Sequence, residues 1–253
     1  MANVIKLRKG LDVNLKGKAA KEEFQVKKPA VYALMPDDFT GMKPKVVVKE
    51  NDVVKVGDSL FVDKNHPEIK FVSPVSGRVT MVERGDRRKV LSVRVEADAE
   101  QQYVDFGKKN VGQMTAQEVK DLLLESGLFG FFRQRPYDVT ANPSDTPKAI
   151  FVSAFNSMPL AADFEYVLRG READFQAGLD ALAKMAKTYL GVSSKQTATA
   201  LTAAKNVEIN FFDGPAPAGN VGVQINHISP INKGEVVWTL GAEEVIFIGH
   251  LLN

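Results

Sequence analysis

The stretch Val53–Val79 (VVKVGDSLFVDKNHPEIKFVSPVSGRV) constrains the fold most, because short apolar runs alternate with polar residues and sharp turn residues separate them. The chain is expected to turn at Gly57-Asp58 and again between Ser73 and Gly77. Gly57 can adopt the positive φ of a tight turn, and Asp58 can close that turn by accepting hydrogen bonds from nearby amides. We therefore predict a small β-module in which two hairpins surround these turns.

This module resembles the barrel-sandwich hybrid of biotinyl and lipoyl carrier domains, where an exposed hairpin tip holds a modified lysine. Lys64, which follows Asp63 as in the lipoyl pattern, is the candidate for such a modification. Against it, the tip Lys64–Glu68 is longer than the turn of those carriers, and Pro67 stiffens it. A solvated lysine is the favoured interpretation, and a carrier module stays as an alternative function.

Composition excludes several classes of site. The chain has 253 residues and no cysteine, which removes disulfides, thiolate zinc sites and cysteine-ligated iron–sulfur clusters. His66, His227 and His250 lie far apart with no carboxylate at ligand spacing, so we predict no metal site. No apolar run approaches the length that spans a bilayer. The length suits one large domain or two smaller ones.

Basic residues gather in two places despite a net charge of only +2: residues 6–28 and residues 84–89. Such clusters suit anionic lipid headgroups or an acidic partner, although many surface lysines serve only solubility. Neither cluster is interleaved with aromatic residues, and we predict no binding of nucleic acid.

A polar stretch between Glu96 and Gly112 divides the chain. We assign 1–110 to an N-terminal segment with the β-module at about 30–97, and 111–253 to a Rossmann-like α/β domain that is truncated at its C-terminal side. Thr115 and Glu118 form a capping box that begins a helix, and Gly127 ends it.

Downstream, strands alternate with helices, which predicts a mixed or parallel sheet covered by helices. We expect the loop 214–219 to be a stiff turn between strands. The expected strands are 149–152, 207–211 and 236–238, and the expected helices are 171–190 and 197–205. The apolar segment 242–252 could be helix or strand, and its acidic start at Glu243-Glu244 favours a helix.

The segment 127–137 (GLFGFFRQRPY) lies where an α/β domain often binds a ligand. Phenylalanines stand where a phosphate cradle would need glycines, which disfavours a dinucleotide. An apolar slot with arginines at its mouth suits a quinone instead, unless these phenylalanines are core or interface anchors. No serine nucleophile elbow is found, and we predict no catalytic residue. The candidate quinone-binding residues are Phe131, Phe132, Arg133, Arg135 and Tyr137.

Several separate blocks resemble the A subunit of the sodium-translocating NADH:quinone oxidoreductase, and the resemblance covers nearly all of the chain. Its α/β part is similar to the flavin-binding subunit of respiratory complex I and to the C subunit of Rnf complexes. The blocks are IKLRKGLDVNLKG, FVDKNHPEIKFVSPVSGRV, SGLFGFFRQRPYD, FVSAFNSMPLAADFEYVLRGREADFQAGLDAL and VVWTLGAEEVIFIGHL.

The resemblance implies a peripheral, non-redox subunit on the cytoplasmic side of a bacterial inner membrane, held there by integral subunits. NAD, flavins and the iron–sulfur cluster would belong to partner subunits, with quinone as a possible ligand of this chain. The flavin-binding relatives have a glycine-rich loop in place of GLFGFF and an acidic cluster in place of residues 156–160. These departures imply that no cofactor is bound here, and they oppose the other alternative, a flavin- or nucleotide-dependent dehydrogenase subunit.

Overall fold

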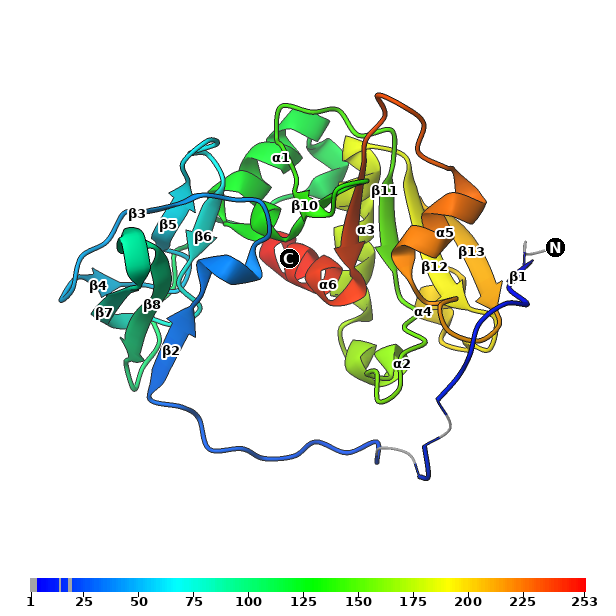
Figure 1. Ribbon diagram of the computed structural model, residues 1–253, viewed down its shortest axis with the longest axis horizontal. Helices are drawn as coiled ribbons and strands as arrows, with labels where there is room; N and C mark the ends of the chain where they lie inside the picture. Colours follow the sequence, from blue (N-terminus) through cyan, green and yellow to red (C-terminus); the bar gives the residue numbers. More distant parts are fainter. Residues whose placement is uncertain (1–3, 14, 18–19) are drawn as a thin grey trace.

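The computed structural model describes residues 4–13, 15–17 and 20–253. Figure 1 shows a β-rich part beside a larger α/β part, with an extended N-terminal segment that runs below both. Within the described residues, no helix combines the length and the apolar character needed to cross a bilayer.

The β-rich part consists of two small antiparallel sheets with the strand orders β2-β8-β7-β4 and β3-β5-β6. Val54, Phe61, Phe71, Val79 and Val93 are all buried in its core. This arrangement agrees with the predicted barrel-sandwich hybrid. The strands are β2 (Val31–Leu34), β3 (Pro44–Val46), β4 (Val53–Val54), β5 (Ser59–Asp63), β6 (Lys70–Val72), β7 (Gly77–Arg84) and β8 (Val90–Ala97), with short 3-10 turns η1 (Pro36–Asp38) and η2 (Asp86–Arg88).

The predicted pairing of these strands is wrong, although the turn residues are right. Gly57 has a φ of 96°, and Asp58 accepts a hydrogen bond from the Lys55 amide at 2.7 Å. However, β4 pairs with β7, whereas β5 pairs with β3 and β6, so this turn passes the chain from one sheet to the other. The hairpins are instead β5–β6 and β7–β8. Alternation fixes which face of a strand is buried, but it leaves the pairing partner open.

The α/β part contains a sheet with the order β1-β13-β12-β11-β14-β9-β10. The first five strands are parallel to one another, β9 is antiparallel to β14, and β10 is antiparallel to β9. Its strands are β1 (Val4–Lys6), β9 (Arg133–Arg135), β10 (Val139–Thr140), β11 (Ile150–Ser153), β12 (Thr188–Ser193), β13 (Glu208–Asp213) and β14 (Val237–Gly241). Its helices are α1 (Ala116–Glu125), α2 (Phe164–Leu168), α3 (Glu172–Met185), α4 (Thr199–Thr202), α5 (Val221–Ile228) and α6 (Ala242–Leu252), with 3-10 turns η3 (Val111–Gln113) and η4 (Leu128–Phe131).

Both faces of this sheet are covered. On β11, Ile150 and Val152 belong to the large core shared with α3 and α6, whereas Phe151 belongs to a second cluster with Ile225 of α5. A parallel sheet that is buried on both sides explains why its strands read as nearly continuous apolar runs.

Such runs also explain one wrong prediction. The helix expected over 171–190 ends at Met185, and Tyr189 lies in β12 between β11 and β13. Its ring stacks on Phe151 at a centroid distance of 4.9 Å. Apolar spacing alone cannot separate a buried strand from the end of a buried helix. The capping box at Thr115 and Glu118, the left-handed Gly127 and the helix 242–252 are confirmed.

The first described strand, β1, belongs to the N-terminal segment in sequence but joins the α/β sheet. Although residues 4–6 were expected within 1–110, Val4 pairs with Phe211 and Ile5 with Phe212 in the α/β sheet. The N-terminal segment therefore completes an edge of the second part before the β-rich part begins. A partner so distant in sequence is invisible to local patterns.

The two parts meet at η4. A Cβ added at Gly127 would lie 2.7 Å from Cγ1 of Val72, and one at Gly130 would lie 2.9 Å from Cε1 of Phe71. The ring of Phe131 lies 6.3 Å from that of Phe39, counted between centroids. The glycines of GLFGFF thus let η4 approach β6 closely.

Candidate functional site

A cavity of about 490 Å³ lies at the carboxyl ends of β11 and β14. From β11 the chain proceeds through β12 and β13 on one side, and it then returns to place β14 on the other side of β11. The strand order therefore reverses between β11 and β14. Open α/β sheets bind their ligands at such a reversal, because the connecting loops diverge there and leave a crevice.

The cavity walls come from segments that are far apart in sequence. β11 and β14 contribute their last residues, α5 and α6 contribute their first turns, and β9 contributes two arginines. The loops 154–158 and 217–220 both line the cavity and contact each other, since the Gly219 amide donates to Ser157 Oγ at 3.0 Å. The charged residues in the walls are Arg133, Arg135, Glu243 and Glu244.

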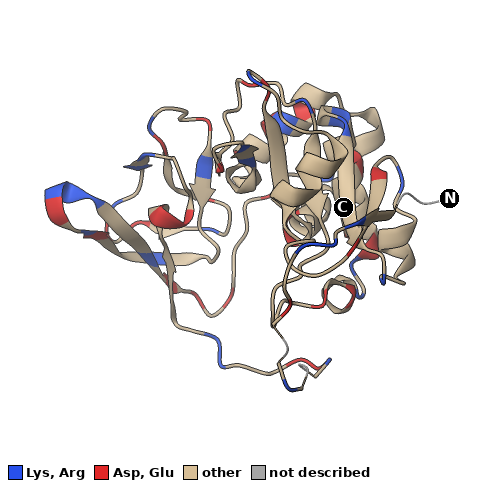
Figure 2. Cartoon of the chain, turned by 45° about the vertical axis from the view of Figure 1, so that its right-hand side comes forward, with Lys and Arg blue, Asp and Glu red and all other residues tan. Residues whose placement is uncertain are grey.

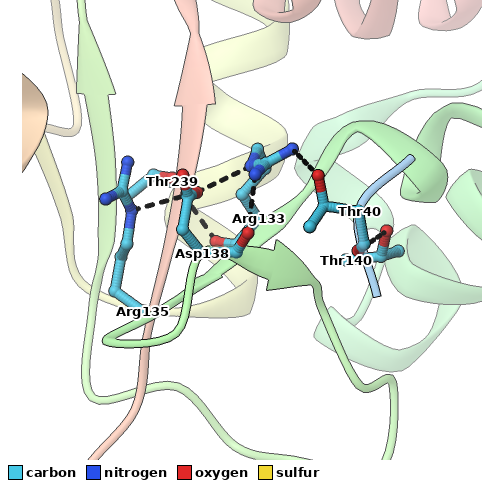
Figure 3. A network of polar contacts seen from close by, with 6 residues as sticks. All are labelled: Thr40, Arg133, Arg135, Asp138, Thr140 and Thr239. Carbon is cyan, nitrogen blue, oxygen red and sulfur yellow. Dashed lines mark hydrogen bonds and ion pairs between the residues drawn. The ribbon is translucent and has the colours of Figure 1, made fainter. Parts of the chain in front are cut away.

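Asp138 holds the two arginines together (Figure 3). Arg133 Nε donates to Asp138 Oδ1 at 2.7 Å, and Arg135 Nε forms an ion pair with the same oxygen at 3.3 Å. The hydrogen bond from Arg133 keeps the pKa of Asp138 below its ordinary value. Arg133 is further bound to Thr40 of the β-rich part at 3.4 Å, so one charge network joins both parts beside the cavity.

Two buried side-chain polar atoms in the described residues have no hydrogen-bond partner, and both belong to residues that line this cavity: Arg135 Nε and Glu244 Oε2. Asp138 neutralises Arg135 as an ion pair but does not complete a hydrogen bond to this nitrogen. Burial raises the pKa of Glu244, the backbone amide of Glu244 opposes this shift, and the neighbouring Glu243 carboxylate adds to it. Buried polar groups without partners are rare in proteins, since each costs about 1–3 kcal/mol. Two such atoms in one cavity indicate a place for a polar ligand.

The structure brings together three of the five predicted site residues. Phe131, Arg133 and Arg135 line the cavity. Phe132 does not line the cavity, because it is fully buried and packs against Phe129 and Trp238. This position agrees with the alternative interpretation, in which the phenylalanines of this segment are core anchors. Tyr137 is 83% exposed and also lies outside the cavity walls.

Sequence reasoning missed most of the remaining lining residues. From its neighbours, Glu244 is predicted only to belong to an acidic helix start, and the loop 214–219 is predicted to be a turn between strands. That loop instead joins β13 to α5 and lends Pro217 and Gly219 to the cavity. Position along the chain is the signal that could identify these residues, because residues that directly follow two predicted parallel strands meet at one edge of the sheet.

The other candidates lie elsewhere. Lys64 is exposed on the β5–β6 hairpin, where its amide donates to the Lys43 carbonyl at 2.7 Å. His66 lies 3.7 Å from Glu68, and His250 lies 3.3 Å from Asp174. Across the part of the chain that the structure describes, no three histidine or acidic side chains gather in a way that could hold a metal ion.

Comparison with known proteins gives two family models that divide the chain. The N-terminal barrel-sandwich hybrid domain of NqrA matches residues 5–98, and the second alpha/beta domain of NqrA matches residues 114–253. Both descriptions agree with the folds of the two parts.

Curated relatives match over 99% of the chain. They include the A subunits of the Na(+)-translocating NADH-quinone reductases from Yersinia pseudotuberculosis at 35% identity, from Pseudomonas aeruginosa at 34% and from Hahella chejuensis at 36%. The chain spans only 56–57% of the length of these relatives. Neither a carrier module nor a dehydrogenase subunit is favoured by these matches.

Proposed function

The chain belongs to the NqrA family, the A subunits of Na(+)-translocating NADH-quinone reductases, and from this membership we propose that it acts as a peripheral, non-redox subunit of such a complex. NADH oxidation, the flavins, the iron–sulfur cluster and sodium movement belong in this proposal to partner subunits. An integral subunit holds the chain at the cytoplasmic side of a bacterial inner membrane.

We further propose that the cavity between β11 and β14 receives the head of a quinone. One observation carries this proposal: Arg135 and Glu244 line the same cavity, and each has a buried side-chain atom, Nε and Oε2, without a hydrogen-bond partner among the described residues. A volume of about 490 Å³ lies within the usual range for small-molecule sites. Phe131 and Met158, which are 39% and 64% exposed, supply apolar surface at the opening for a tail.

The two polar atoms match the two oxygens of a quinone ring. Arg135 Nε can donate a hydrogen bond to one carbonyl oxygen, and its charge stabilises negative charge on that oxygen during reduction. A protonated Glu244 can donate to the other carbonyl oxygen, and the raised pKa favours this protonated form. Both atoms have almost no accessible surface, so in this proposal the two side chains turn toward the ligand and thereby gain the hydrogen bond that they lack.

A phosphate-bearing flavin fits these walls poorly. The loop that follows β11, Ala154–Met158, contains no glycine, whereas a phosphate cradle needs backbone amides that side chains leave uncovered. At the start of α6, Gly241 is approached by Glu244 Oε2, which would lie 2.3 Å from an added Cβ. The carboxyl group of Glu244 thus occupies the space through which a phosphate would approach the start of this helix.

Quinone binding is expected to depend on pH through Glu244. Because the donor is the protonated acid, affinity for a short-chain ubiquinone should be highest below the folded-state pKa and should fall as the pH rises through it. Glu244→Gln keeps a donor without a titrating proton, so it should keep the affinity and abolish its pH dependence. Glu244→Ala should weaken binding about 10-fold, as expected for one hydrogen bond. Quenching of the only tryptophan, Trp238, whose neighbour Thr239 lines the cavity, reports the binding.

Glu243→Gln is the matched control, since Glu243 lines the same cavity but is exposed and has no buried atom without a partner. It should leave the affinity at low pH nearly unchanged and keep the pH dependence, with the fall in affinity moved to slightly lower pH, because the Glu243 carboxylate helps to raise the pKa of Glu244. Stability gives a second readout. The pKa of Glu244 is raised above 4.5, so its ionisation should cost stability as the pH rises past 4.5 through the folded-state pKa, and Glu244→Gln should remove that loss. Equal quinone affinity in wild type and Glu244→Ala at every pH would refute the site.

The subunit role is tested separately from the quinone site. A tagged integral subunit of the reductase should co-purify with this chain from detergent-solubilised membranes, and quinone reduction by NADH should fall at least 10-fold when the chain is omitted and recover on its return. Arg133→Ala, which breaks the bond to Thr40 beside the cavity, should still co-purify. Full activity without the chain would contradict the proposed role.

A further inference from the structure

The β7–β8 hairpin ends in a turn with an unusual backbone. In Asp86–Lys89 the Lys89 amide donates to the Asp86 carbonyl at 3.0 Å, and the two central residues, Arg87 and Arg88, have φ values of 53° and 61°. Positive φ at both central positions is the pattern of a type I′ turn, which matches the twist of a hairpin.

Two arginines are an unfavourable choice for this turn. Residues with a Cβ are strained in the left-handed region, and Asn-Gly is the pair that such turns prefer. Strain of this kind persists where the side chains serve another purpose. The two guanidinium groups are thus present at the tip although the backbone conformation of Arg87 and Arg88 destabilises the turn.

The tip is exposed and cationic. Residues 86–89 and Arg84 all face solvent, and Arg84 Nη1 donates to the Arg88 carbonyl at 3.3 Å. Within residues 84–89 the four cations Arg84, Arg87, Arg88 and Lys89 stand beside one carboxylate, Asp86. Lys89 is paired with Asp37 at 2.6 Å. Figure 2 shows this blue tip at the left extremity of the β-rich part, far from the α/β part.

We propose that this tip docks onto an anionic phospholipid surface. The guanidinium fork matches phosphate oxygens, and Arg87 and Arg88, which form no ion pair with the described residues, can each reach one headgroup. A protruding four-residue turn is convex and offers far less than the roughly 800 Å² per partner that a stable protein interface needs. Leu91 adds an apolar side chain: it is 38% exposed and lies close to Gly85 beside the arginines. Basic and apolar groups together suit the headgroup region of a bilayer.

The test uses sedimentation of this chain with vesicles of equal parts phosphatidylglycerol and phosphatidylcholine at 50 mM salt. Wild type should bind these vesicles and not pure phosphatidylcholine, and 0.5 M salt should abolish binding through screening. The double variant Arg87→Asn with Arg88→Gly should bind about 25-fold more weakly, at roughly fivefold per arginine. The same variant should melt about 4 °C higher, because the turn strain is relieved.

Two further variants make the result specific. Arg87→Lys with Arg88→Lys keeps the charges and should retain most of the vesicle binding. Lys27→Asn with Lys28→Gly removes two exposed cations from the other basic cluster and should change binding less than twofold. A tip that serves an acidic protein instead would leave vesicle binding undetectable in wild type, and this outcome overturns the proposal. Equal vesicle binding by the Asn-Gly variant and wild type also overturns it.

Discussion

Gly249→Ala is expected to lower the free energy of unfolding by about 3 kcal/mol, the upper end of the range for overpacking in a core. A Cβ at Gly249 of α6 would lie only 1.6 Å from the Asp174 carbonyl oxygen of α3. Gly178 faces α6 in the same way, with an added Cβ at 2.1 Å from the Val245 carbonyl oxygen. The two helices must separate to admit the methyl group, and they lose packing along their whole contact. Urea unfolding of the purified chain measures the change.

Phe247→Ala is the control on the same helix, because Phe247 is 51% exposed and its removal should cost less than about 1 kcal/mol. Helix propensity alone predicts the opposite sign for Gly249→Ala, a gain of roughly 1 kcal/mol. A more stable Gly249→Ala variant would therefore contradict the close packing of α3 on α6. Both glycines lie where α3 crosses α6, so either methyl group alone already forces the two helices apart. The double variant Gly178→Ala with Gly249→Ala should therefore lose less free energy of unfolding than the sum of the two single losses.

Phe132→Ala is expected to cost about 3–5 kcal/mol, the usual loss for a fully buried phenylalanine. The ring of Phe132 stacks on Phe129 at 5.1 Å and meets the edge of Trp238 at 5.6 Å, counted between centroids. Its removal leaves a cavity between η4 and β14. Thermal unfolding should show the midpoint lowered by roughly 6–20 °C, at 2–4 °C per kcal/mol for a chain of this size.

The adjacent Phe131→Ala separates structure from ligand binding. Phe131 is 39% exposed and lines the cavity, so its loss should cost no more than about 1 kcal/mol of stability while it weakens quinone quenching of Trp238 severalfold. If Phe131→Ala destabilised the chain as much as Phe132→Ala, the assignment of one ring to the cavity and the other to the core would be wrong.

Local signals predicted local structure well. Thr115 and Glu118 satisfy each other's backbone amides within one helical turn, so their spacing alone identifies the start of α1. Gly127 ends the region of α1 for an equally local reason, a φ of 80°. Tyr189 shows the limit: its position in a strand depends on β11 and β13, which lie on either side of β12.

The candidate site follows the same rule. Phe131, Arg133 and Arg135 were predicted because two arginines directly follow aromatic residues in one short segment, whereas Phe132, in the same segment, is buried in the core. Glu244 could not be recognised as part of the site from its neighbours. It lines the same cavity as the arginines only because β14 pairs with β9 on one side and with β11 on the other.

By itself the sequence determined the two-part organisation, the turn at Gly57 and the capped helix after Thr115, because each depends on residues within a few positions of one another. Only the tertiary structure decided which strands pair, that the first strand joins the distant α/β sheet, and that Arg135 and Glu244 share one cavity. Those outcomes depend on contacts between residues that are up to about two hundred positions apart along the chain, where loop closure and burial, and not local spacing, select the partner.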